Sequence, residues 1–550
     1  MSPGSKRTPA TAALLVMAVA APARADTAAE KLATTTSGYG ELGADISTRE
    51  LAISRTDTEA DLSGYLRIRG DALYNLDLDR GLTPSGNALF PVPAADPSAQ
   101  TLTLVDSRLR TDVAIYPPGS GVAVKVRVDV LDNLAWGTAT AGELATGQPA
   151  AGAISDNASR RTFRVKRAYG EALIPVGLLA AGRIGAQWGL GMVANGGDCP
   201  DCDGGDAADR IALVTPLFDH LVAVSYDFAA TGPVRQRRDG ARAIDFEPTD
   251  DIRTLTVAAL HYHTPLARAR LLAAGRAAFE YGALFSHSHQ ENDVPAAYLP
   301  AAAPIAVDPA QIVARGFATT AVDGWLRLAL PLLRIEAEVA YVTATVDEPS
   351  LIPGVDVDQS ITSRQLGIAL ESDLHSPGGQ ISGGVDGGYA SGDPAPGFGA
   401  FPVPGQRPPQ PGDVDGPQAA LPGDTTVDNF RFDSDYHIDR ILFREIIGTV
   451  TDAVYVRPHA RATLLQTGHA RVTFGVAAIA SWAAEAQSTP GGDRFLGVEI
   501  DPTLGLYTRD GFSAVLESAV LIPGPAFDNH AANLTAQVAQ LWRVRLGYWF

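Results

Sequence analysis

Apolar and polar residues alternate one by one over unusually long segments of this chain. In residues 65–79, one set of alternate positions is apolar and the other is charged or polar: Leu66, Ile68, Ala72, Tyr74, Leu76 and Leu78 against Arg67, Arg69, Asp71, Asn75, Asp77 and Asp79. Successive side chains of a β-strand point to opposite sides, so the pattern predicts a strand with one apolar and one charged face. Globular strands usually have about 5–6 residues, whereas strands that cross a membrane need about 9–11.

The same alternation recurs almost to the end of the chain. It predicts strands at 65–79, 107–116, 122–131, 162–174, 178–190, 221–229, 252–264, 277–288, 318–328, 333–346, 363–374, 380–391, 453–467, 470–483, 496–508, 512–521 and 534–550. A soluble β-sandwich also alternates, but we expect its strands to be shorter and its solvent face less evenly charged.

The connections between these strands differ in length. Short turns at 117–121 and 509–511 alternate with long loops at 80–101, 133–160, 289–317 and 392–450. This asymmetry is typical of an outer-membrane barrel. We therefore predict an all-β fold, a transmembrane antiparallel up-and-down β-barrel of about 16 strands (range 14–18), with both termini on the short-turn side. Residues 392–429, rich in Pro, Gly and Asp, are expected to be too polar to pack a core and to be mobile.

The N-terminal segment predicts export. Lys6 and Arg7 precede an apolar run at 12–21, and residues 23–25 form an A-x-A cleavage site, as in a secretory signal peptide. We expect a signal peptide at 1–25, a periplasmic extension or partial plug at 26–60, and the barrel at 61–550.

The C-terminal segment ends on an aromatic residue, which is unusual for a soluble domain. Trp542, Val544, Leu546, Tyr548 and Phe550 share one face, and Arg543, Arg545 and Gly547 share the other. Val544, Leu546, Tyr548 and Phe550 resemble the C-terminal β-signal of bacterial outer-membrane proteins. The resemblance implies location in the cell outer membrane, contact with its lipid and lipopolysaccharide, and the barrel assembly machinery as a partner.

Further segments resemble Gram-negative porin families, including the alginate-export-like and phosphate-porin-like barrels. These segments lie at 165–170, 181–185, 188–191 and 385–393. The resemblance implies transport of small hydrophilic solutes. Porin trimers are common, so a homotrimer is a candidate assembly.

Composition and the lack of catalytic motifs argue against several other classes of protein. The chain has 550 residues, and its 43 basic against 62 acidic residues give a net charge of −19, which argues against a nucleic-acid partner. Two cysteines cannot staple a chain of this length. No G-x-S-x-G elbow or Ser/His/Asp grouping indicates an enzyme. The pairs His261/His263 and His287/His289 are expected near opposite rims, so we assign no metal to them.

Charged residues on the lumen phase of the first and last strands form a predicted basic stripe. The candidate pore-lining residues are Arg67, Arg69, Asp71, Arg108, Arg110, Asp112, Lys125, Arg127, Asp129, Arg543 and Arg545. Facing acidic residues elsewhere, the stripe would create a transverse field and a mild anion preference. Alternatively, the arginines and aspartates brace the wall through cross-strand ion pairs. Both interpretations stay open.

The segment 195–209 combines aspartates, glycines and two cysteines. Asp198, Asp201, Asp203 and Asp206 are candidate ligands of a structural Ca²⁺, which prefers oxygen ligands. Cys199 and Cys202 lack the further ligands of a structural zinc site, and outside the cytoplasm a disulfide is expected. The alternative to calcium is an acidic solvated loop that the disulfide pins. No other cofactor is expected.

Barrels of about 16–18 strands leave an aqueous channel. The sequence thus predicts a non-enzymatic porin for passive diffusion of small hydrophilic solutes. The alternatives are a plugged structural or adhesive barrel and an outer-membrane hydrolase.

Overall fold

Eighteen strands form one closed antiparallel sheet in the computed structural model, which describes residues 56–93, 96, 100–137, 139–140, 155–156, 163–237, 243–295, 309–400 and 406–550. They are β1 (Glu59–Tyr74), β2 (Thr101–Tyr116), β3 (Val122–Ala135), β6 (Phe163–Ile174), β7 (Gly177–Gly185), β8 (Ala207–Leu217), β9 (His220–Ala229), β12 (Ile252–His261), β13 (Ala278–Gln290), β14 (Phe317–Ala329), β15 (Leu333–Val346), β16 (Ile361–His375), β17 (Ile381–Ala390), β18 (Ala453–Gln466), β19 (Ala470–Ala483), β20 (Phe495–Thr508), β21 (Phe512–Pro523) and β22 (Ala539–Trp549).

Small elements occupy the connections. Two-stranded ribbons pair β4 (Ala139–Thr140) with β5 (Ser155–Asp156) and β10 (Val234–Gln236) with β11 (Ala243–Asp245). The helical elements are α4 (Pro265–Ala273), η3 (Pro309–Gln311), the π-helix η4 (Leu442–Ile447) and η5 (Pro525–Phe527). None of the helices in the described ranges has the length and apolarity required to cross a bilayer.

The first and last strands close the cylinder. β1 pairs with β22 from Tyr65 opposite Trp549 to Tyr74 opposite Gln540, and with β2 on its other side. The backbones of Gly64 and Phe550 extend this pairing with hydrogen bonds of 3.0 and 3.1 Å. Closure leaves no open sheet edge, which confirms the predicted barrel.

The two faces of the wall have opposite chemistry. On β22, the side chains of Trp542, Val544 and Tyr548 are about half exposed (52%, 48% and 52%), whereas Arg543 between them is 1% exposed. The large exposed apolar side chains of other strands follow the same outward phase, including Val124, Phe285, Val339 and Leu504. The barrel is therefore apolar outside and charged or small inside, as the alternation predicted.

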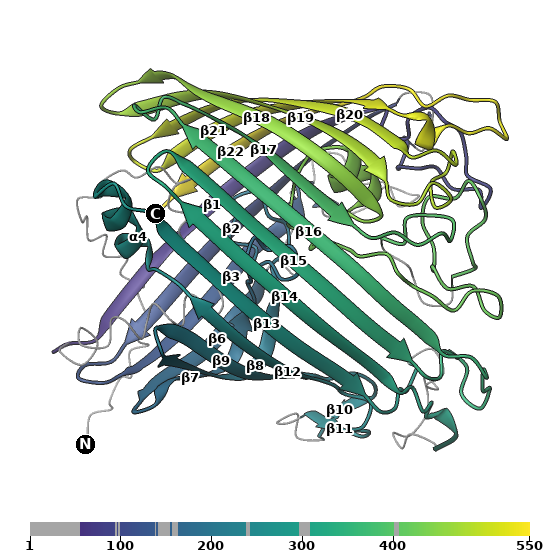
Figure 1. Ribbon diagram of the computed structural model, residues 1–550, viewed down its shortest axis with the longest axis horizontal. Coiled ribbons are helices and arrows are strands. Elements are labelled where there is room, and N and C mark those ends of the chain that lie inside the picture. The colour runs from purple at the N-terminus through teal and green to yellow at the C-terminus, as the bar shows by residue number, and fades with distance from the viewer. Residues whose placement is uncertain are drawn as a thin grey trace, which may run out of the picture.

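Long loops and short turns lie at opposite ends of the cylinder. In Figure 1 the C-terminus and α4 lie at the left end with the short turns, and the β10–β11 ribbon lies at the right end among the long loops. We call these the short-turn end and the long-loop end.

The predicted elements need three corrections. The sheet has 18 strands rather than the best estimate of 16, although 18 lies within the predicted range. The sequence prediction omitted β8 and extended the preceding strand to residue 190, whereas β7 ends at Gly185. β8 lacks a sustained alternation because both faces are apolar over residues 211–214: Ala212 and Val214 pack inside, and Ile211 is exposed outside.

The long connection from β17 to β18 was also misjudged. Residues 392–429 were expected to be polar and mobile, but Phe398 of this segment is 2% exposed. It packs in a buried core with the inner wall and with Phe430, Phe432, Ile441 and Phe443 from the rest of the connection. Its scattered aromatic residues meet small and apolar side chains of the wall such as Ala369 and Ala477. The connection therefore occupies part of the lumen.

Two predicted N-terminal segments lie mostly outside the residues that the structure describes. The expected signal peptide at 1–25 and most of the extension at 26–60 lie outside the described residues, and β1 begins at Glu59.

Candidate functional site

The predicted basic stripe lies on the inner wall where β22, β1, β2, β3 and β6 adjoin. Its predicted members are Arg67, Arg69, Arg108, Arg110, Lys125, Arg127, Arg543 and Arg545, and Arg167 of β6 extends it. All of them belong to the buried or nearly buried phase of their strands. The register therefore brings together residues that are up to 478 positions apart in sequence (545 − 67), as the pairing of the first and last strands predicted.

Register places like charges directly opposite one another in this stripe. Arg67 faces Arg108, Arg69 faces Arg545, and Arg127 faces Arg167. Directly opposed like charges destabilise a sheet. Such pairs therefore require acceptors between them.

The connection between β7 and β8 supplies those acceptors. Residues 195–206, which we call the acidic loop, fold into the lumen and give one acceptor to each arginine pair. The backbone oxygen of Cys202 accepts hydrogen bonds from Arg67 (3.2 Å) and Arg108 (2.7 Å). The Asp201 carboxylate lies 3.4 Å from Arg69 and 2.9 Å from Arg545.

The third pair receives Asp198. This carboxylate forms an ion pair with Arg127 and lies 3.1 Å from Arg167. The acidic loop is thus complementary in charge and spacing to the stripe. Its docking compensates the repulsion that the strand register imposes.

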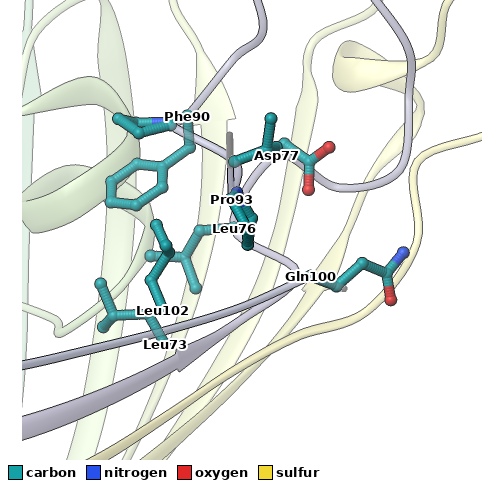
Figure 2. A pocket seen from close by; sticks show the side chains of 9 residues that line it. Leu73, Leu76, Asp77, Phe90, Pro93, Gln100 and Leu102 are labelled. Atoms are coloured by element: carbon teal, nitrogen blue, oxygen red, sulfur yellow. The ribbon is translucent and has the colours of Figure 1, made fainter. Parts of the chain in front are cut away.

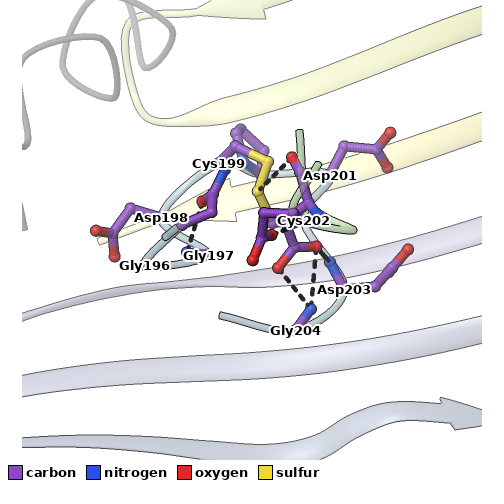
Figure 3. The surroundings of a disulfide bond; sticks show 12 residues. Gly196, Gly197, Asp198, Cys199, Asp201, Cys202, Asp203 and Gly204 are labelled. Carbon is purple, nitrogen blue, oxygen red and sulfur yellow. Dashed lines mark hydrogen bonds between the residues drawn. A yellow bond between two sulfur atoms is a disulfide. The ribbon is translucent and has the colours of Figure 1, made fainter. Parts of the chain in front are cut away.

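A disulfide shapes the acidic loop at this contact. Cys199 and Cys202 are bonded, with an S–S distance of 1.98 Å, and Asp198 lies on the opposite side of the disulfide from Asp201 and Asp203 (Figure 3). The Asp435 carboxylate accepts hydrogen bonds from the backbone nitrogens of Asp203 (2.6 Å) and Gly204 (3.1 Å). Covalent and hydrogen-bonded restraints therefore fix the direction of the aspartates.

A second inward loop completes the cluster from the other side. Arg444 of η4 pairs with Asp201 and lies 3.0 Å from the Asp203 carboxylate. Burial raises the pKa of Asp203, but Arg69, Arg444 and Arg67 outweigh it and hold this pKa at about 2. Burial also opposes ionisation of Asp201, yet Arg444, Arg545 and Arg543 lower its pKa well below the usual range. Both carboxylates are ionised at neutral pH.

The acidic residues predicted within the stripe brace neighbouring strands. Asp71 pairs with Arg543 (2.5 Å), Asp112 with Arg127 (2.6 Å), and Asp129 with Arg110 (2.8 Å). Lys125, also predicted as pore-lining, lies 3.0 Å from Glu171. The geometry contains both a basic stripe and the cross-strand bracing that we considered as its alternative.

The arrangement bears on the calcium candidates. Asp198, Asp201 and Asp203 have arginine partners, so cations of the protein occupy their surroundings. Asp206 instead accepts the Asn195 backbone N–H at 3.1 Å, and burial together with Asp206 raises the pKa of the neighbouring Asp433 to about 8. The arginine partners of Asp198, Asp201 and Asp203 supply the counter-charge that a bound Ca²⁺ would provide, which favours the alternative, an acidic loop pinned by a disulfide.

Some charged residues of the interior remain accessible to water. The Asp203 side chain is 40% exposed on the docked loop, while Arg334 of β15 and Arg457 of β18 are 34% and 29% exposed on the wall. Arg334 pairs with Asp373 (2.6 Å), and Arg457 pairs with Asp386 (2.6 Å). Water therefore reaches charged groups on both the docked loop and the wall.

A separate small pocket lies at the long-loop end of β1 and β2 (Figure 2). Leu73, Leu76, Phe90 and Leu102 give it a mainly apolar lining, and Asp77 is its single titratable residue. Burial raises the pKa of Asp77. A lone carboxyl group without a nucleophile or base beside it is no catalytic constellation.

Sequence reasoning missed several residues of the central site. Asp106 accepts from Arg69 (2.8 Å) and Arg67 (3.2 Å), and Arg167, Asp435 and Arg444 contribute the contacts described above. The positions of Arg167 and Asp106 in their strands contained a usable signal, since both have the inward phase. Arg444 and Asp435 carried none, because they lie in an irregular loop.

Comparisons with known proteins give likenesses only among solved structures. No protein-family model matches the chain, and no curated protein matches it. The outer membrane channel DcaP of Acinetobacter baumannii aligns over 90% of this chain and 98% of its own, with 12% identity and a TM-score of 0.35. OccK11 (OpdR) of Pseudomonas aeruginosa aligns over 91% and 98%, with 10% identity and a TM-score of 0.43. The trimer form of OmpT, an outer membrane protein of Vibrio cholerae, aligns over 90% and 100%, with 9% identity and a TM-score of 0.31. With TM-scores below 0.5, these likenesses carry no argument about function.

Proposed function

We propose that the protein is an outer-membrane channel for passive diffusion of small hydrophilic solutes, narrowed by the acidic loop where it docks on the arginine stripe. The observation that carries this proposal is a closed 18-stranded cylinder with an apolar exterior and water-accessible charged groups on its interior. An apolar band around a polar interior suits a barrel in lipid. Barrels of this size have room for an aqueous passage beside inward-folded loops.

The location and assembly follow from the same proposal. We place both termini and the short turns in the periplasm and the long loops outside the cell. Val544, Leu546, Tyr548 and Phe550 would serve as the assembly signal, and lipopolysaccharide would surround the long-loop end. A homotrimer remains the proposed assembly.

Ion selectivity is proposed to be weak and anion-preferring. Arg127 and Arg545 keep side-chain exposures of 13% and 16%, whereas most of the stripe is buried against carboxylates. Paired charges screen each other over distances shorter than the Debye length of about 8 Å. Because the accessible arginines are paired with carboxylates in this way, we propose that the preference they set is only mild.

Reconstitution in planar bilayers tests the channel and its selectivity. We expect stepwise single-channel conductance, with the reversal potential in a salt gradient displaced toward anions. Charge reversal in Arg69→Glu/Arg127→Glu should shift that potential toward cations. Unchanged selectivity in the variant would favour a bracing role for both arginines.

A plugged structural barrel is the second candidate, because the β17–β18 connection packs a core inside the lumen. A folded protein that gives no conductance and no liposome swelling would support that candidate. Release of fatty acid or peptide from added lipid or protein would instead indicate a hydrolase.

A further inference from the structure

A second group of aspartates lies in a different connection, between β9 and β12, at the long-loop end (Figure 1). Asp245 ends β11, and Asp250 and Asp251 immediately precede β12. One carboxylate oxygen of each residue lies within 4.8 Å of the others. We call these three residues the outer acidic cluster.

Asp250 is the buried member of the cluster. The residue is 0% exposed, and neither carboxylate oxygen has a hydrogen-bond partner within the described part of the chain. A buried, unpaired carboxylate is strongly unfavourable unless a cation or donors compensate it. An unsatisfied group of this kind therefore points to a ligand that binds at the carboxylate.

The surrounding hydrogen bonds hold the cluster in position. The backbone oxygen of Asp250 accepts hydrogen bonds from the Thr231 hydroxyl and from Nε2 of Gln290 (2.6 Å). The Asp251 carboxylate accepts the Thr231 backbone N–H at 3.2 Å, and the Asp245 carboxylate accepts that of Glu247 at 2.9 Å. The three side chains are thus directed toward one another by donors other than cationic groups.

The backbone of Gly232 closes one side of the cluster. Gly232 has φ +72°, and a Cβ atom built there would lie 1.6 Å from Oδ2 of Asp250. Only glycine combines this backbone conformation with such a close approach to the carboxylate.

Two arginines in the described part of this region have other partners. Arg253 donates to the backbone oxygen of Pro248 at 3.0 Å, and Arg315 pairs with Asp293 at 2.6 Å. In the ranges that the structure describes, none of the ion pairs within 4.0 Å involves Asp245, Asp250 or Asp251. The charge of the cluster is therefore not compensated by the described chain.

We propose that Asp245, Asp250 and Asp251 bind a hard divalent cation, Ca²⁺, on the extracellular side of the barrel. Ca²⁺ accepts several carboxylate oxygens in irregular geometry and completes its 6–8 ligands with carbonyl oxygens and water, whereas Mg²⁺ retains most of its own waters. The bound ion supplies the counter-charge of Asp250 and ties β11 to the start of β12. This site is independent of whether the barrel conducts.

Calorimetric titration of the full-length, detergent-solubilised barrel tests the site. After removal of divalent ions with a chelator, CaCl₂ is titrated into the wild type, Asp250→Asn and Asp358→Asn, a control in another long-end connection with an exposed aspartate. We expect one Ca²⁺ per chain, with Kd on the order of 10⁻⁴–10⁻³ M as in other extracellular modules. Asp250→Asn removes one of the three carboxylates, so we expect it to raise Kd at least about tenfold. Asp358→Asn should leave Kd unchanged.

A second variant separates the site from general charge effects. Gly232→Ala keeps every carboxylate but places a Cβ atom against Asp250, so we expect it to lose Ca²⁺ binding as well. The unheated-sample shift on SDS gels verifies that each variant is folded. No Ca²⁺ binding by the folded wild type, or equal binding by Asp250→Asn, would overturn the proposal.

Discussion

The acidic loop in the lumen and the outer acidic cluster each bring three aspartates together in one connection between strands, but they differ in their counter-charge. Asp198, Asp201 and Asp203 form ion pairs with arginines of four strands, β1, β3, β6 and β22, and of η4. Asp245, Asp250 and Asp251 face one another with no cationic partner in the described ranges. Burial acts on both groups, and the result depends on which charges the fold places beside them.

The pKa values express this difference. Arginines outweigh burial at Asp203 and lower its pKa to about 2. At Asp250, burial and then the neighbouring carboxylates Asp245 and Asp251 raise the pKa to about 7. An aspartate-rich segment is therefore no evidence for calcium until the positions of nearby cations are known.

The largest effect is expected from Asp201→Asn. The Asp201 carboxylate pairs with Arg444 and lies within 3.6 Å of Arg69, Arg543 and Arg545, so its loss leaves several buried arginines undercompensated. Removing one partner of a buried ion pair costs about 3–5 kcal/mol. We expect the acidic loop to detach and single-channel conductance to rise. The exposed Asp219→Asn serves as the control, and equal conductance in both variants would show that the loop does not narrow the passage.

An intermediate effect is expected from opening the disulfide in Cys199→Ser/Cys202→Ser. A covalent link over so short a loop restricts the free loop by about 2 kcal/mol in the chain-entropy model. Because the arginine contacts remain, we expect more open-channel noise with little change in mean conductance. Reductant should reproduce the effect in the wild type and do nothing to the double variant. Noise that is the same with and without the disulfide would contradict the prediction.

A smaller effect is expected from Ca²⁺ on the outer acidic cluster. At a concentration tenfold above Kd, binding stabilises the bound loop by about 1.4 kcal/mol. Hydrogen exchange should slow about tenfold at the backbone amides of residues 243–251 in the wild type and in Asp201→Asn, but not in Asp250→Asn. Protection that depends on Asp201 instead would assign the ion to the lumen.

The smallest effect is expected from mild acid on the acidic loop. A lowered pKa gives stabilisation that is present above the unfolded value of about 3.9 and is lost as pH falls through the folded value. For Asp203 that folded pKa is about 2. Conductance should therefore stay constant between pH 7 and pH 4, and a loop that opens between pH 7 and pH 5 would contradict the assigned ion pairs.

Strand prediction was accurate where the two faces of the wall differ. Residues 333–346 were predicted as a strand and form β15 with the same bounds. β8 was missed because its inner face packs Ala212 and Val214 in an apolar cluster, so polar residues do not alternate with apolar ones. Periodicity reports the contrast between two environments, and it disappears where both are apolar.

The stripe and its cross-strand aspartates were predictable, but the loop residues that dock on it were not. Strand phase and the pairing of β1 with β22 place Arg67, Arg69, Arg543 and Arg545 together, because register propagates residue by residue along a ladder. The positions of Asp201 and Arg444 depend on loops whose path no periodicity encodes. The same limit explains why Phe398 was expected in a mobile segment but packs in a core.

The sequence by itself determined a cylinder with an apolar outside, a charged inside and a basic stripe where the first and last strands pair. Alternation is a local property of the chain, and the order of the strands follows from the sequence directly. The tertiary structure alone decided which aspartates meet arginines and which meet only each other. Electrostatic energy depends on distances of a few ångströms between segments far apart in sequence, and only the folded loops set those distances.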